Sequence, residues 1–498
     1  MSSKDQSSEQ IQIEPRAPLV LVLDIGSSST RVLLCDSSAC VVAMVREKSA
    51  LIVAPDGTAV DDAEAVVARV VKCIDQALEQ AGPLAQQIAA VGCATYASNI
   101  TGIGADGAPC TPVFTYADTR SAQAAVALQN ELDEVAINKR TGCLLRTSYL
   151  PALFRWLETE QPETLRSARR WASIGEVLFE RFFGRSTITY SLASWSGLLN
   201  RATFDWDAEL LAELPIDAEQ LGTLSDVDTA CSGLRDEWAR RWPALANVPW
   251  FSAVADGAAA NIGSGCVNSD RIALSIGTTG ALRMLLPSEP EIPRGLWRYC
   301  VDRRSPLLGS ATSEGGNVLT WALETLKLEA ADLDRYLHDP KGANHGLTVL
   351  PFIVGERGPG WRGDVRATIN GISITTSALD IARAALEGVT YRWARIAELL
   401  RTAAPGTPTI VASGGALRHV PSWSQLIADA LGLPLVLSAE AETTSRGVAL
   451  LALRSLGHID NLAAIPAALG STLTPDPERL AAHQTAQALQ ADLYERLG

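Results

Sequence analysis

The first hundred residues alternate short apolar runs with polar turns. Residues 19–24 are rich in Val and Leu, and a polar turn leads to a second apolar run at 32–34 and then to a third at 41–45. This pattern predicts three successive strands. The apolar spacing then becomes helical over residues 61–80, and residues 88–93 return to a strand. The order of elements predicts a mixed α/β fold.

The second half of the chain begins with a pattern that matches the first. LDIGSSSTRVLL starts at Leu23 and LSIGTTGALRMLL starts at Leu274, and each joins an apolar run to a Ser/Thr-rich turn, an Arg and another apolar run. The repeat lies about half a chain away, which predicts two domains built on equivalent hairpins. We place the boundary near residue 260, with domains over residues 17–260 and 261–498.

Later elements keep the α/β character. Residues 378–401 have the spacing of a long amphipathic helix, and residues 409–412 form a short apolar run that predicts a strand. A sharp turn, Ser-Gly-Gly-Ala at 413–416, follows this strand. Helix and strand patterns then alternate to the end.

The length and composition of the chain are typical of a globular protein as large as an enzyme. The 498 residues are 47% hydrophobic and 20% charged, and the chain is too long for one compact core. The formal net charge of -14 argues against DNA, RNA or an anionic membrane surface as the main partner, because those partners attract positive charge. We therefore expect a small-molecule ligand.

Cysteine usage and the N-terminus indicate the compartment. The nine cysteines are scattered without a Cys-x-x-Cys pair, and we expect them to be reduced thiols. Residues 1–16 are polar and contain no apolar signal segment, so we expect a disordered tail. No stretch approaches the roughly 18 uninterrupted apolar residues of a membrane-spanning helix. These features predict a cytoplasmic protein.

The turn after the first predicted strand carries groups that suit a nucleotide phosphate and its metal ion. Backbone amides and hydroxyls in such a turn suit phosphate oxygens, and Asp24 at the strand end can hold hydrated Mg²⁺. The segment lacks the Gly-Lys-Ser/Thr of a P-loop, and a plain Ser-rich hairpin is the alternative. The candidate phosphate ligands are Gly26, Ser27, Ser28, Ser29 and Arg31.

Two further turns extend this candidate nucleotide site. The turn at 277–280 repeats the first without its acidic residue, so that the two turns can hold a triphosphate from both sides. The Gly-Gly turn separates a strand from a helix, where backbone without side chains can lie against adenine or ribose. Each turn alone is compatible with an ordinary loop. The candidate residues are Gly277, Thr278, Thr279, Gly414, Gly415 and Ala416.

Asp256 stands out because it lies in a stretch of small, apolar residues. An unpaired buried carboxylate is costly, and Asp also suits the N-cap of a helix. As a functional group, Asp256 can accept the proton of a sugar hydroxyl while that oxygen attacks the γ-phosphate of ATP. Capping and catalysis do not exclude each other.

These elements, in this order, resemble the FGGY family of carbohydrate kinases over almost the whole chain. The segment LPFIVGERGPGWRGDVRATINGI, at 350–372, is similar to the family's Gly-Glu-Arg segment. The resemblance implies two actin-like (ribonuclease H-like) ATPase domains with an interdomain cleft that closes around ATP, Mg²⁺ and substrate. It also implies Asp256 as the catalytic base and adds Asn317, in SEGGNVLTW, to the nucleotide site.

Within the family the chain resembles the gluconate kinase branch. The segments SLASWSGLLNRATFDWD, ASIGEVLFERFFG, ADGAAANIGSG, IGTTGALR and SEGGNVLTW carry this likeness. Where glycerol kinase has an Arg-Glu pair for its substrate, this chain has Ala97 and Ser98, and the Met-His of xylulokinase is also absent. The resemblance therefore implies a polyol of another shape at these two residues.

A gluconate carboxylate needs a cation or hydrogen-bond donor in its pocket. The resemblance places Arg120 and Arg146 in segments near the substrate, and it places Tyr116 and Asp118 in the strip that meets sugar hydroxyls. Ser148 belongs to the same candidate substrate site. Each of these residues could instead form a structural salt bridge or lie at the surface.

The predicted reaction is transfer of the ATP γ-phosphate to a primary hydroxyl of a sugar acid, D-gluconate to 6-phosphogluconate. A pentulose or polyol kinase, such as a xylulokinase or ribulokinase, is the alternative within the family. A non-catalytic actin-like ATP-binding sensor is a further alternative, which the presence of both Asp24 and Asp256 disfavours. The sequence does not determine the oligomeric state, and a homodimer is compatible with the resemblance.

Overall fold

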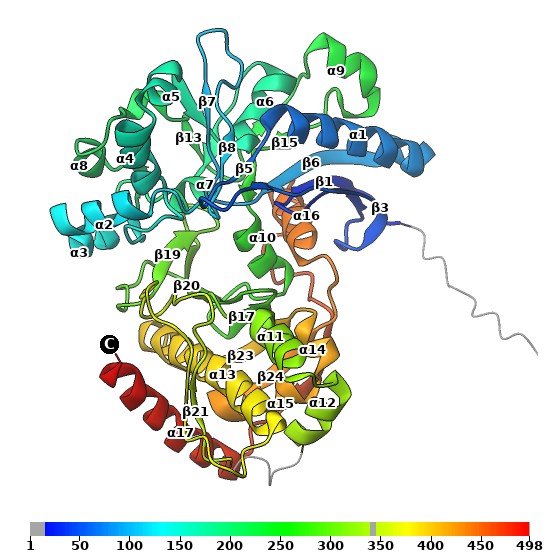
Figure 1. The fold of residues 1–498 in the computed structure, drawn as a ribbon. Coiled ribbons are helices and arrows are strands. Elements are labelled where there is room, and N and C mark those ends of the chain that lie inside the picture. Colours follow the sequence, from blue (N-terminus) through cyan, green and yellow to red (C-terminus); the bar gives the residue numbers. More distant parts are fainter. Residues whose placement is uncertain (1–14, 339–344, 498) are drawn as a thin grey trace, which may run out of the picture.

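The computed structural model describes residues 15–338 and 345–497, so most of the predicted tail, residues 1–14, lies outside the described chain. Two α/β halves follow one another along the chain, and Figure 1 shows the N-terminal half above the C-terminal half. Between them lie α10 (Asp256–Gly263) and α16 (Thr443–Ser455). None of the helices in the described part of the chain combines the length and apolar character needed to cross a membrane.

The sheet of the N-terminal half contains the predicted meander. Its strand order is β14-β15-β6-β1-β2-β3, with β16 also pairing with β6. β1 runs antiparallel to β2 and parallel to β6. The strands are β1 (Leu19–Ile25), β2 (Ser29–Cys35), β3 (Val41–Lys48), β6 (Ile88–Thr95), β14 (Ala230–Cys231), β15 (Trp250–Phe251) and β16 (Val254–Ala255).

The sheet of the C-terminal half repeats this arrangement. Its order is β19-β20-β18-β17-β23-β24-β25, and β17 runs antiparallel to β18 and parallel to β23. The prediction that both halves open with equivalent hairpins is therefore confirmed. The strands are β17 (Arg271–Ile276), β18 (Gly280–Leu285), β19 (Trp297–Cys300), β20 (Pro306–Thr312), β23 (Thr409–Ser413), β24 (Leu435–Ser438) and β25 (Leu469–Leu473).

Two helices predicted from periodicity form with identifiable caps. α1 (Ala63–Ala81) begins after Asp62, whose carboxylate accepts from the Ala65 N–H. α13 (Ala378–Ala403) begins with a capping box between Ser377 and Asp380.

The remaining elements cover the two sheets and connect their strands. The other helices are α2 (Ala122–Glu131), α3 (Glu134–Thr141), α4 (Leu150–Glu160), α5 (Pro162–Ser167), α6 (Ile174–Phe183), α7 (Tyr190–Ser194), α8 (Ala208–Leu211), α9 (Asp236–Arg241), α11 (Gly316–Leu326), α12 (Ala330–His338), α14 (Ala416–His419), α15 (Ser422–Leu431) and α17 (Pro477–Arg496). Short paired strands are β4 (Ile52–Val53), β5 (Ala59–Asp61), β7 (Thr101–Ile103), β8 (Val113–Phe114), β9 (Arg170–Ala172), β10 (Ile188–Thr189), β11 (Leu199–Asn200), β12 (Asp205–Trp206), β13 (Leu224–Ser225), β21 (Thr348–Leu350) and β22 (Thr368–Asn370).

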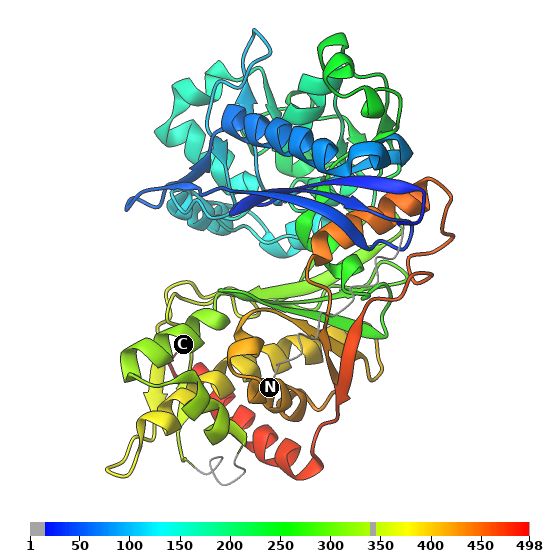
Figure 2. The same ribbon diagram turned by 90° about the vertical axis from the view of Figure 1, so that its right-hand side faces the viewer.

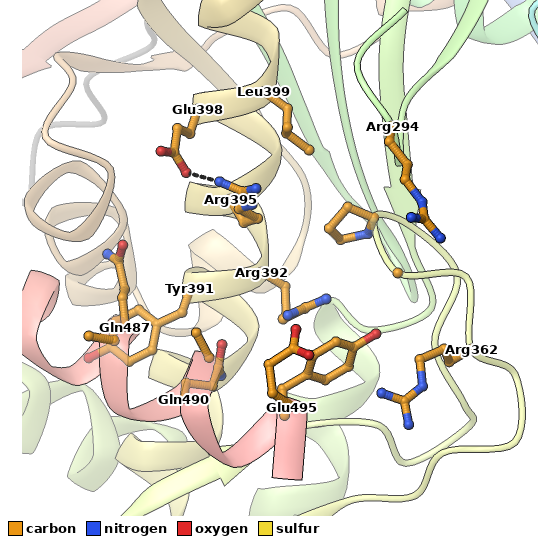
Figure 3. Close-up of a pocket in the computed structure, with 15 residues that line it drawn as sticks. Arg294, Arg362, Tyr391, Arg392, Arg395, Glu398, Leu399, Gln487, Gln490 and Glu495 are labelled. Atoms are coloured by element: carbon orange, nitrogen blue, oxygen red, sulfur yellow. Dashed lines mark hydrogen bonds and ion pairs between the residues drawn. The ribbon is translucent and has the colours of Figure 1, made fainter. Parts of the chain in front are cut away.

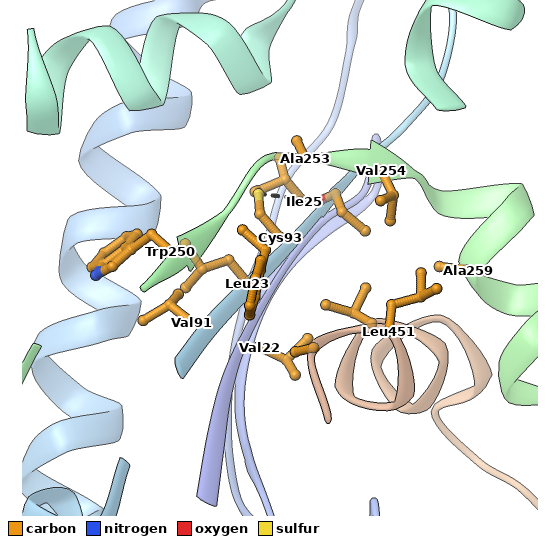
Figure 4. Packing of buried hydrophobic residues seen from close by; sticks show 14 of the residues in the cluster. Val22, Leu23, Ile25, Val91, Cys93, Trp250, Ala253, Val254, Ala259 and Leu451 are labelled. Atoms are coloured by element: carbon orange, nitrogen blue, oxygen red, sulfur yellow. Dashed lines mark hydrogen bonds between the residues drawn. The ribbon is translucent and has the colours of Figure 1, made fainter. Parts of the chain in front are cut away.

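α16 comes late in the sequence but packs on the sheet of the N-terminal half. It contacts β1 and β6, and Figure 2 shows it against this sheet on the side opposite α1. Figure 4 shows Leu451 of α16 and Ala259 of α10 beside Val22 and Ile25 of β1. Every residue of β1 is buried, as expected for a strand covered on both faces. Sequence order therefore does not coincide with spatial order in this part of the fold.

α10 and α16 approach so closely that glycine is required where they meet. A Cβ on Gly263 would lie 1.7 Å from the carbonyl oxygen of Thr443, and a Cβ on Gly447 would lie 1.9 Å from that of Ala259. Both obstructing atoms belong to the backbone, so no side-chain rotation can make room. The two helices are therefore locked in one register.

Candidate active site

The first predicted phosphate turn forms the tip of the β1–β2 hairpin. The Gly26 N–H donates to the Ser29 carbonyl at 3.0 Å and closes the turn. Ser28 is exposed and Ser27 is half-buried, whereas Ser29 is buried in β2. The turn thus presents Ser27 and Ser28 to a ligand more readily than Ser29.

Asp24 is buried at the end of β1 beneath the N-terminus of α16. Its Oδ2 lies 3.0 Å from Arg31 and accepts a 3.0 Å hydrogen bond from the Ser445 hydroxyl. Arg31 also pairs with Glu442 at 2.5 Å. Burial, with a smaller contribution from the nearby Asp256 carboxylate, raises the pKa of Asp24 to about 6 against the opposing charge of Arg31. Ser445 and Glu442 were not predicted, because they lie far from Asp24 in the sequence.

Asp256 is the first residue of α10. The preceding Ala255 occupies the N-cap position and offers no side-chain cap, while Asp256 Oδ1 accepts from the Gly257 N–H at 2.7 Å. Burial raises the pKa of Asp256, whereas hydrogen bonds from backbone groups and the positive charges of Arg283 and Arg31 lower it. The carboxylate is thus held near two cations and the Asp24 site.

The second predicted turn joins β17 to β18 and is braced by the start of α11. The Gly277 and Thr278 carbonyls accept from the Gly316 and Asn317 N–H groups at 2.8 and 3.2 Å. Gly277, Thr278 and Thr279 are exposed. Asn317 Oδ1 accepts from the Gly315 N–H at 2.8 Å, so this side chain helps to shape the turn at the start of α11.

The Gly-Gly turn lies against the same hairpin. Gly414 has φ of +138°, and a Cβ there would lie 1.9 Å from the Ile276 carbonyl oxygen at the end of β17. Gly415 precedes α14, and Ala416 begins it. A Cβ on Gly316 would lie 3.4 Å from the Ala416 Cβ. Tertiary packing thus brings together the second turn, the start of α11 and the Gly-Gly turn, three of the four predicted nucleotide segments.

Glu314 lies just before this junction and is buried without a hydrogen-bond partner for its Oε1. Burial, with a smaller contribution from the nearby Glu356 carboxylate, raises its pKa from 4.5 to about 8. The folded protein therefore favours the protonated form.

We expect Glu314→Gln to stabilise the protein increasingly as pH rises. Below pH 4.5 the carboxyl is protonated in both folded and unfolded chains, and between 4.5 and about 8 the unfolded chain loses its proton first. Wild-type stability should fall over that window by up to about 1.4 kcal/mol per pH unit, and the neutral amide removes this loss. Thermal denaturation midpoints at pH 5 and 8 measure the effect. Glu398→Gln, at an exposed residue paired with Arg395, is the matched control, and parallel pH curves for Glu314→Gln and wild type would contradict the assignment.

Ala97 and Ser98 lie beside Asp256. A backbone hydrogen bond from Ala97 lowers the pKa of Asp256, and the Ser98 hydroxyl donates to the Trp195 carbonyl at 2.7 Å. A Cβ on Gly257 would lie 2.8 Å from Trp195 Cη2. The structure therefore brings the predicted pair Ala97-Ser98 to the Asp256 carboxylate, together with Trp195, which was not predicted.

The predicted substrate strip divides into two parts. The Tyr116 hydroxyl lies 3.4 Å from Ser27 Oγ, beside the first turn. Arg120 instead makes a forked ion pair with Asp118, with contacts of 2.6 to 3.1 Å, and its guanidinium lies over the Trp156 ring at 4.6 Å. The charges of Asp118 and Arg120 thus offset each other within this ion pair.

Arg146 also has an ion-pair partner in the structure. Its guanidinium pairs with Glu134, donates to the Leu145 carbonyl at 2.7 Å and lies over the Trp361 ring. Ser148 is half-buried two residues further on. The carboxylate-binding role of Arg120 or Arg146 stays a prediction, and in this structure either arginine would first have to leave an ion pair.

Arg283 is the cation that sequence reasoning did not select. It belongs to IGTTGALR, the second copy of the repeated hairpin, where it was noted only as part of the pattern. In the structure it acts on Asp256 electrostatically, and a Cβ on Gly257 would lie 3.3 Å from its Nη2. Arg31 is the equivalent arginine of the first hairpin. This equivalence is the sequence signal that could have identified Arg283.

A separate cavity of about 810 Å³ lies in the C-terminal half, between α13, α17 and the segment around Arg362 (Figure 3). Its lining includes four arginines and contains none of the predicted site residues. Two of these arginines are ion-paired, Arg392 with Glu356 and Arg395 with Glu398. The predicted site residues lie elsewhere, so the candidate active site is the one around Asp256.

The chain matches known proteins along most of its length. A model of the FGGY family of carbohydrate kinases, N-terminal domain, matches residues 19–263, and the C-terminal domain model matches residues 272–456. A gluconokinase of Bacillus subtilis (strain 168) is 26% identical over 471 residues, covering 92% of this chain and 91% of that protein.

Two solved structures match the whole architecture. They are a ligand-bound xylulose kinase and a gluconate kinase, both from Lactobacillus acidophilus, with TM-scores of 0.89 and 0.88. Each is 26% identical to this chain, and each match covers 96% of this chain and 98% of the other.

Proposed function

Because the chain belongs to the FGGY family of carbohydrate kinases and is a phosphotransferase with an alcohol acceptor, we propose that it phosphorylates a primary hydroxyl of a sugar acid, D-gluconate. ATP is the proposed phosphate donor and 6-phosphogluconate the proposed product. The predicted nucleotide segments belong to both halves, so the proposed ATP site draws on both hairpin turns.

The position of Asp256 is the observation that carries this proposal. Its carboxylate lies beside Ala97 and Gly257 on one side and within the electrostatic reach of Asp24 and Arg31 on the other. Asp24 ends the strand that leads into the first turn, so acceptor-binding and phosphate-binding groups adjoin at this point. A carboxylate with a raised pKa is also a better proton acceptor than an ordinary aspartate.

The proposed step is an in-line displacement. The substrate hydroxyl gives its proton to Asp256 as its oxygen forms a bond to the γ-phosphorus, and the bond between that phosphorus and the bridging oxygen of ATP breaks. ADP leaves with the electron pair of the broken bond. Backbone N–H groups and hydroxyls of the two turns are the proposed donors to the phosphate oxygens.

The groups around Asp24 fit a hydrated Mg²⁺ ion. Mg²⁺ prefers oxygen ligands and keeps several waters, so that one or two carboxylates suffice. Arg31 and Ser445 both contact Oδ2, and Oδ1 has no hydrogen-bond partner among the described residues. Asp24 would hold the ion through Oδ1 and its waters. When bound, Mg²⁺ supplies positive charge that offsets the charge of the phosphate oxygens.

Gluconate is favoured as the acceptor by the relatives and by the residues beside Asp256. The gluconokinase of Bacillus subtilis matches nearly the full chain, and Ala97 and Ser98 lack the charges that the resemblance associates with glycerol. A xylulose kinase structure at the same identity keeps a pentulose kinase as the second candidate.

We expect the purified protein to release ADP from Mg-ATP in the presence of D-gluconate, with kcat/KM at least about 100-fold above that for xylulose, ribulose, glycerol or erythritol. The physical reason is that a site built for a charged, polyhydroxylated acid leaves polar groups unpaired with a neutral, shorter substrate. A coupled ADP assay over this panel, with identification of the phosphorylated product, measures the preference. Faster turnover of a neutral ketose than of gluconate would replace the substrate while keeping the reaction class.

A further inference from the structure

Arg283 projects from the C-terminal sheet toward the N-terminal half. On β18 its neighbours Leu282 and Met284 pack into the core of the C-terminal half, whereas Leu285 belongs to the cluster that contains β1 and β6. Successive side chains of a strand point to opposite faces, so Arg283 shares the face of Leu285. That face meets α10, which carries Asp256.

The Arg283 side chain is half-buried and unpaired. Its Nε is buried without a hydrogen-bond partner, and it makes no hydrogen bond or ion pair with any residue in the described part of the chain. Burial lowers its pKa, and the Asp256 carboxylate opposes this shift without coming within 4.0 Å. A partly buried guanidinium without a hydrogen-bond or ion-pair partner is costly. An anion bound beside it would therefore lower its free energy.

Trp195 supplies a second unused donor at the same place. Its indole Nε1 is buried without a partner, and its ring stacks on Tyr299 with centroids 3.9 Å apart. The Gly257 α-carbon lies close to both the indole and Arg283, since a Cβ there would be 2.8 Å from Trp195 Cη2 and 3.3 Å from Arg283 Nη2. The Trp195 ring and the Arg283 guanidinium thus flank the residue that follows Asp256.

Arg357, from the Gly-Glu-Arg segment, adds a second positive charge. It lowers the pKa of Arg283, as a neighbouring like charge does, and its side chain has no hydrogen-bond or ion-pair partner among the described residues. Two uncompensated guanidinium groups that repel each other both gain from an anion placed between them.

We propose that Arg283, assisted by Trp195 Nε1 and Arg357, binds the carboxylate of the sugar acid while Asp256 faces the hydroxyl that is phosphorylated. Arg283 and Asp256 interact electrostatically without forming an ion pair, so each remains available to a different group of the substrate. Arg120 and Arg146 are less suited, because both are already held by carboxylates. The inference rests on the proposed function, in that it assumes an acidic substrate.

The test compares D-gluconate with D-gluconamide, which replaces the carboxylate by a neutral amide. We expect Arg283→Gln to raise KM for gluconate by roughly 30-fold or more, the lower end of the cost of removing one partner of a buried charge pair, with little change for gluconamide. The KM of Arg283→Lys for gluconate should lie between those of wild type and Arg283→Gln, because lysine keeps the charge but loses the forked geometry. Arg395→Gln, an exposed arginine outside the site, is the matched control and should leave both substrates unchanged.

Each other result overturns the inference in a recognisable way. Equal losses on gluconate and gluconamide would assign Arg283 to the phosphoryl group, and a gluconate-specific rise of KM in Arg120→Gln or Arg146→Gln, with Arg283→Gln unchanged, would assign the carboxylate elsewhere. Gluconate turnover within threefold of wild type in Arg283→Gln would remove its role while leaving the proposed function intact. Absence of gluconate turnover in the wild-type protein would overturn the proposed function, and this inference with it.

Discussion

Replacing Asp256 with asparagine should lower kcat for phosphoryl transfer by roughly 10²- to 10⁴-fold, the usual contribution of a general base. Asparagine keeps the size of the side chain and an oxygen that can accept from the Gly257 N–H, but it cannot take the proton of the attacking hydroxyl. Substrate binding should change much less, because the turns that hold the phosphates belong to other segments. The measurements are kcat and KM in a coupled ADP assay, with ATP and gluconate binding followed by calorimetry.

Asp226→Asn is the matched control for this variant. Asp226 is also a carboxyl whose pKa is raised by burial, but its hydrogen bonds go to the Val227 and Arg303 N–H groups outside the site. That variant should keep its kcat. Wild-type turnover in Asp256→Asn would assign the proton transfer to another group, and loss of both binding and turnover would indicate that the substitution disturbs α10 instead of the chemistry.

Replacing Gly447 with alanine should destabilise the fold by about 3 kcal/mol, the upper end of the usual cost of overpacking a core. The added methyl would lie 1.9 Å from the Ala259 carbonyl oxygen, and the higher helix propensity of alanine, worth up to about 1 kcal/mol, does not offset this clash. Because α10 and α16 would have to move apart, kcat should fall as well, since α10 carries Asp256 and α16 places Ser445 on Asp24.

Urea denaturation monitored by tryptophan fluorescence measures the stability loss, and Gly263→Ala on the facing helix should behave similarly. Gly363→Ala is the control, because a Cβ there meets nothing within 4 Å and the residue does not have a positive φ. If Gly447→Ala were as stable and active as Gly363→Ala, the helices would be free to separate, and the locked register would not set the geometry of the site.

Short-range patterns in the sequence were enough to predict the fold class and the turns that we propose as nucleotide segments. Alternation of apolar and polar residues predicted the hairpins β1–β2 and β17–β18, and the Ser/Thr-rich turns and the Gly-Gly turn were read from local chemistry. Asp256 was identifiable because an acid in a small, apolar stretch is conspicuous. Such signals need only neighbouring residues, since strand period and turn conformation are local properties.

Predictions that depended on partners distant in the sequence were incomplete. For Arg120 and Arg146 the sequence left open a substrate contact or a structural salt bridge, and the tertiary structure pairs them with Asp118 and Glu134. Arg283 was passed over, although it lies near Asp256 without a partner. Whether a cation is available for a ligand depends on which carboxylates folding brings within about 4 Å, and spacing along the chain does not contain that information.

The sequence by itself therefore determined the repeated α/β plan and the turns, and it singled out Asp256 as the proposed base, all from local periodicity and residue chemistry. The tertiary structure alone decided that α16 returns to the N-terminal sheet and sets Ser445 and Glu442 beside Asp24 and Arg31. It also decided which arginine remains unpaired beside Asp256. These outcomes depend on long-range packing, where a close helix crossing and the burial of charge bring together groups from opposite ends of the chain.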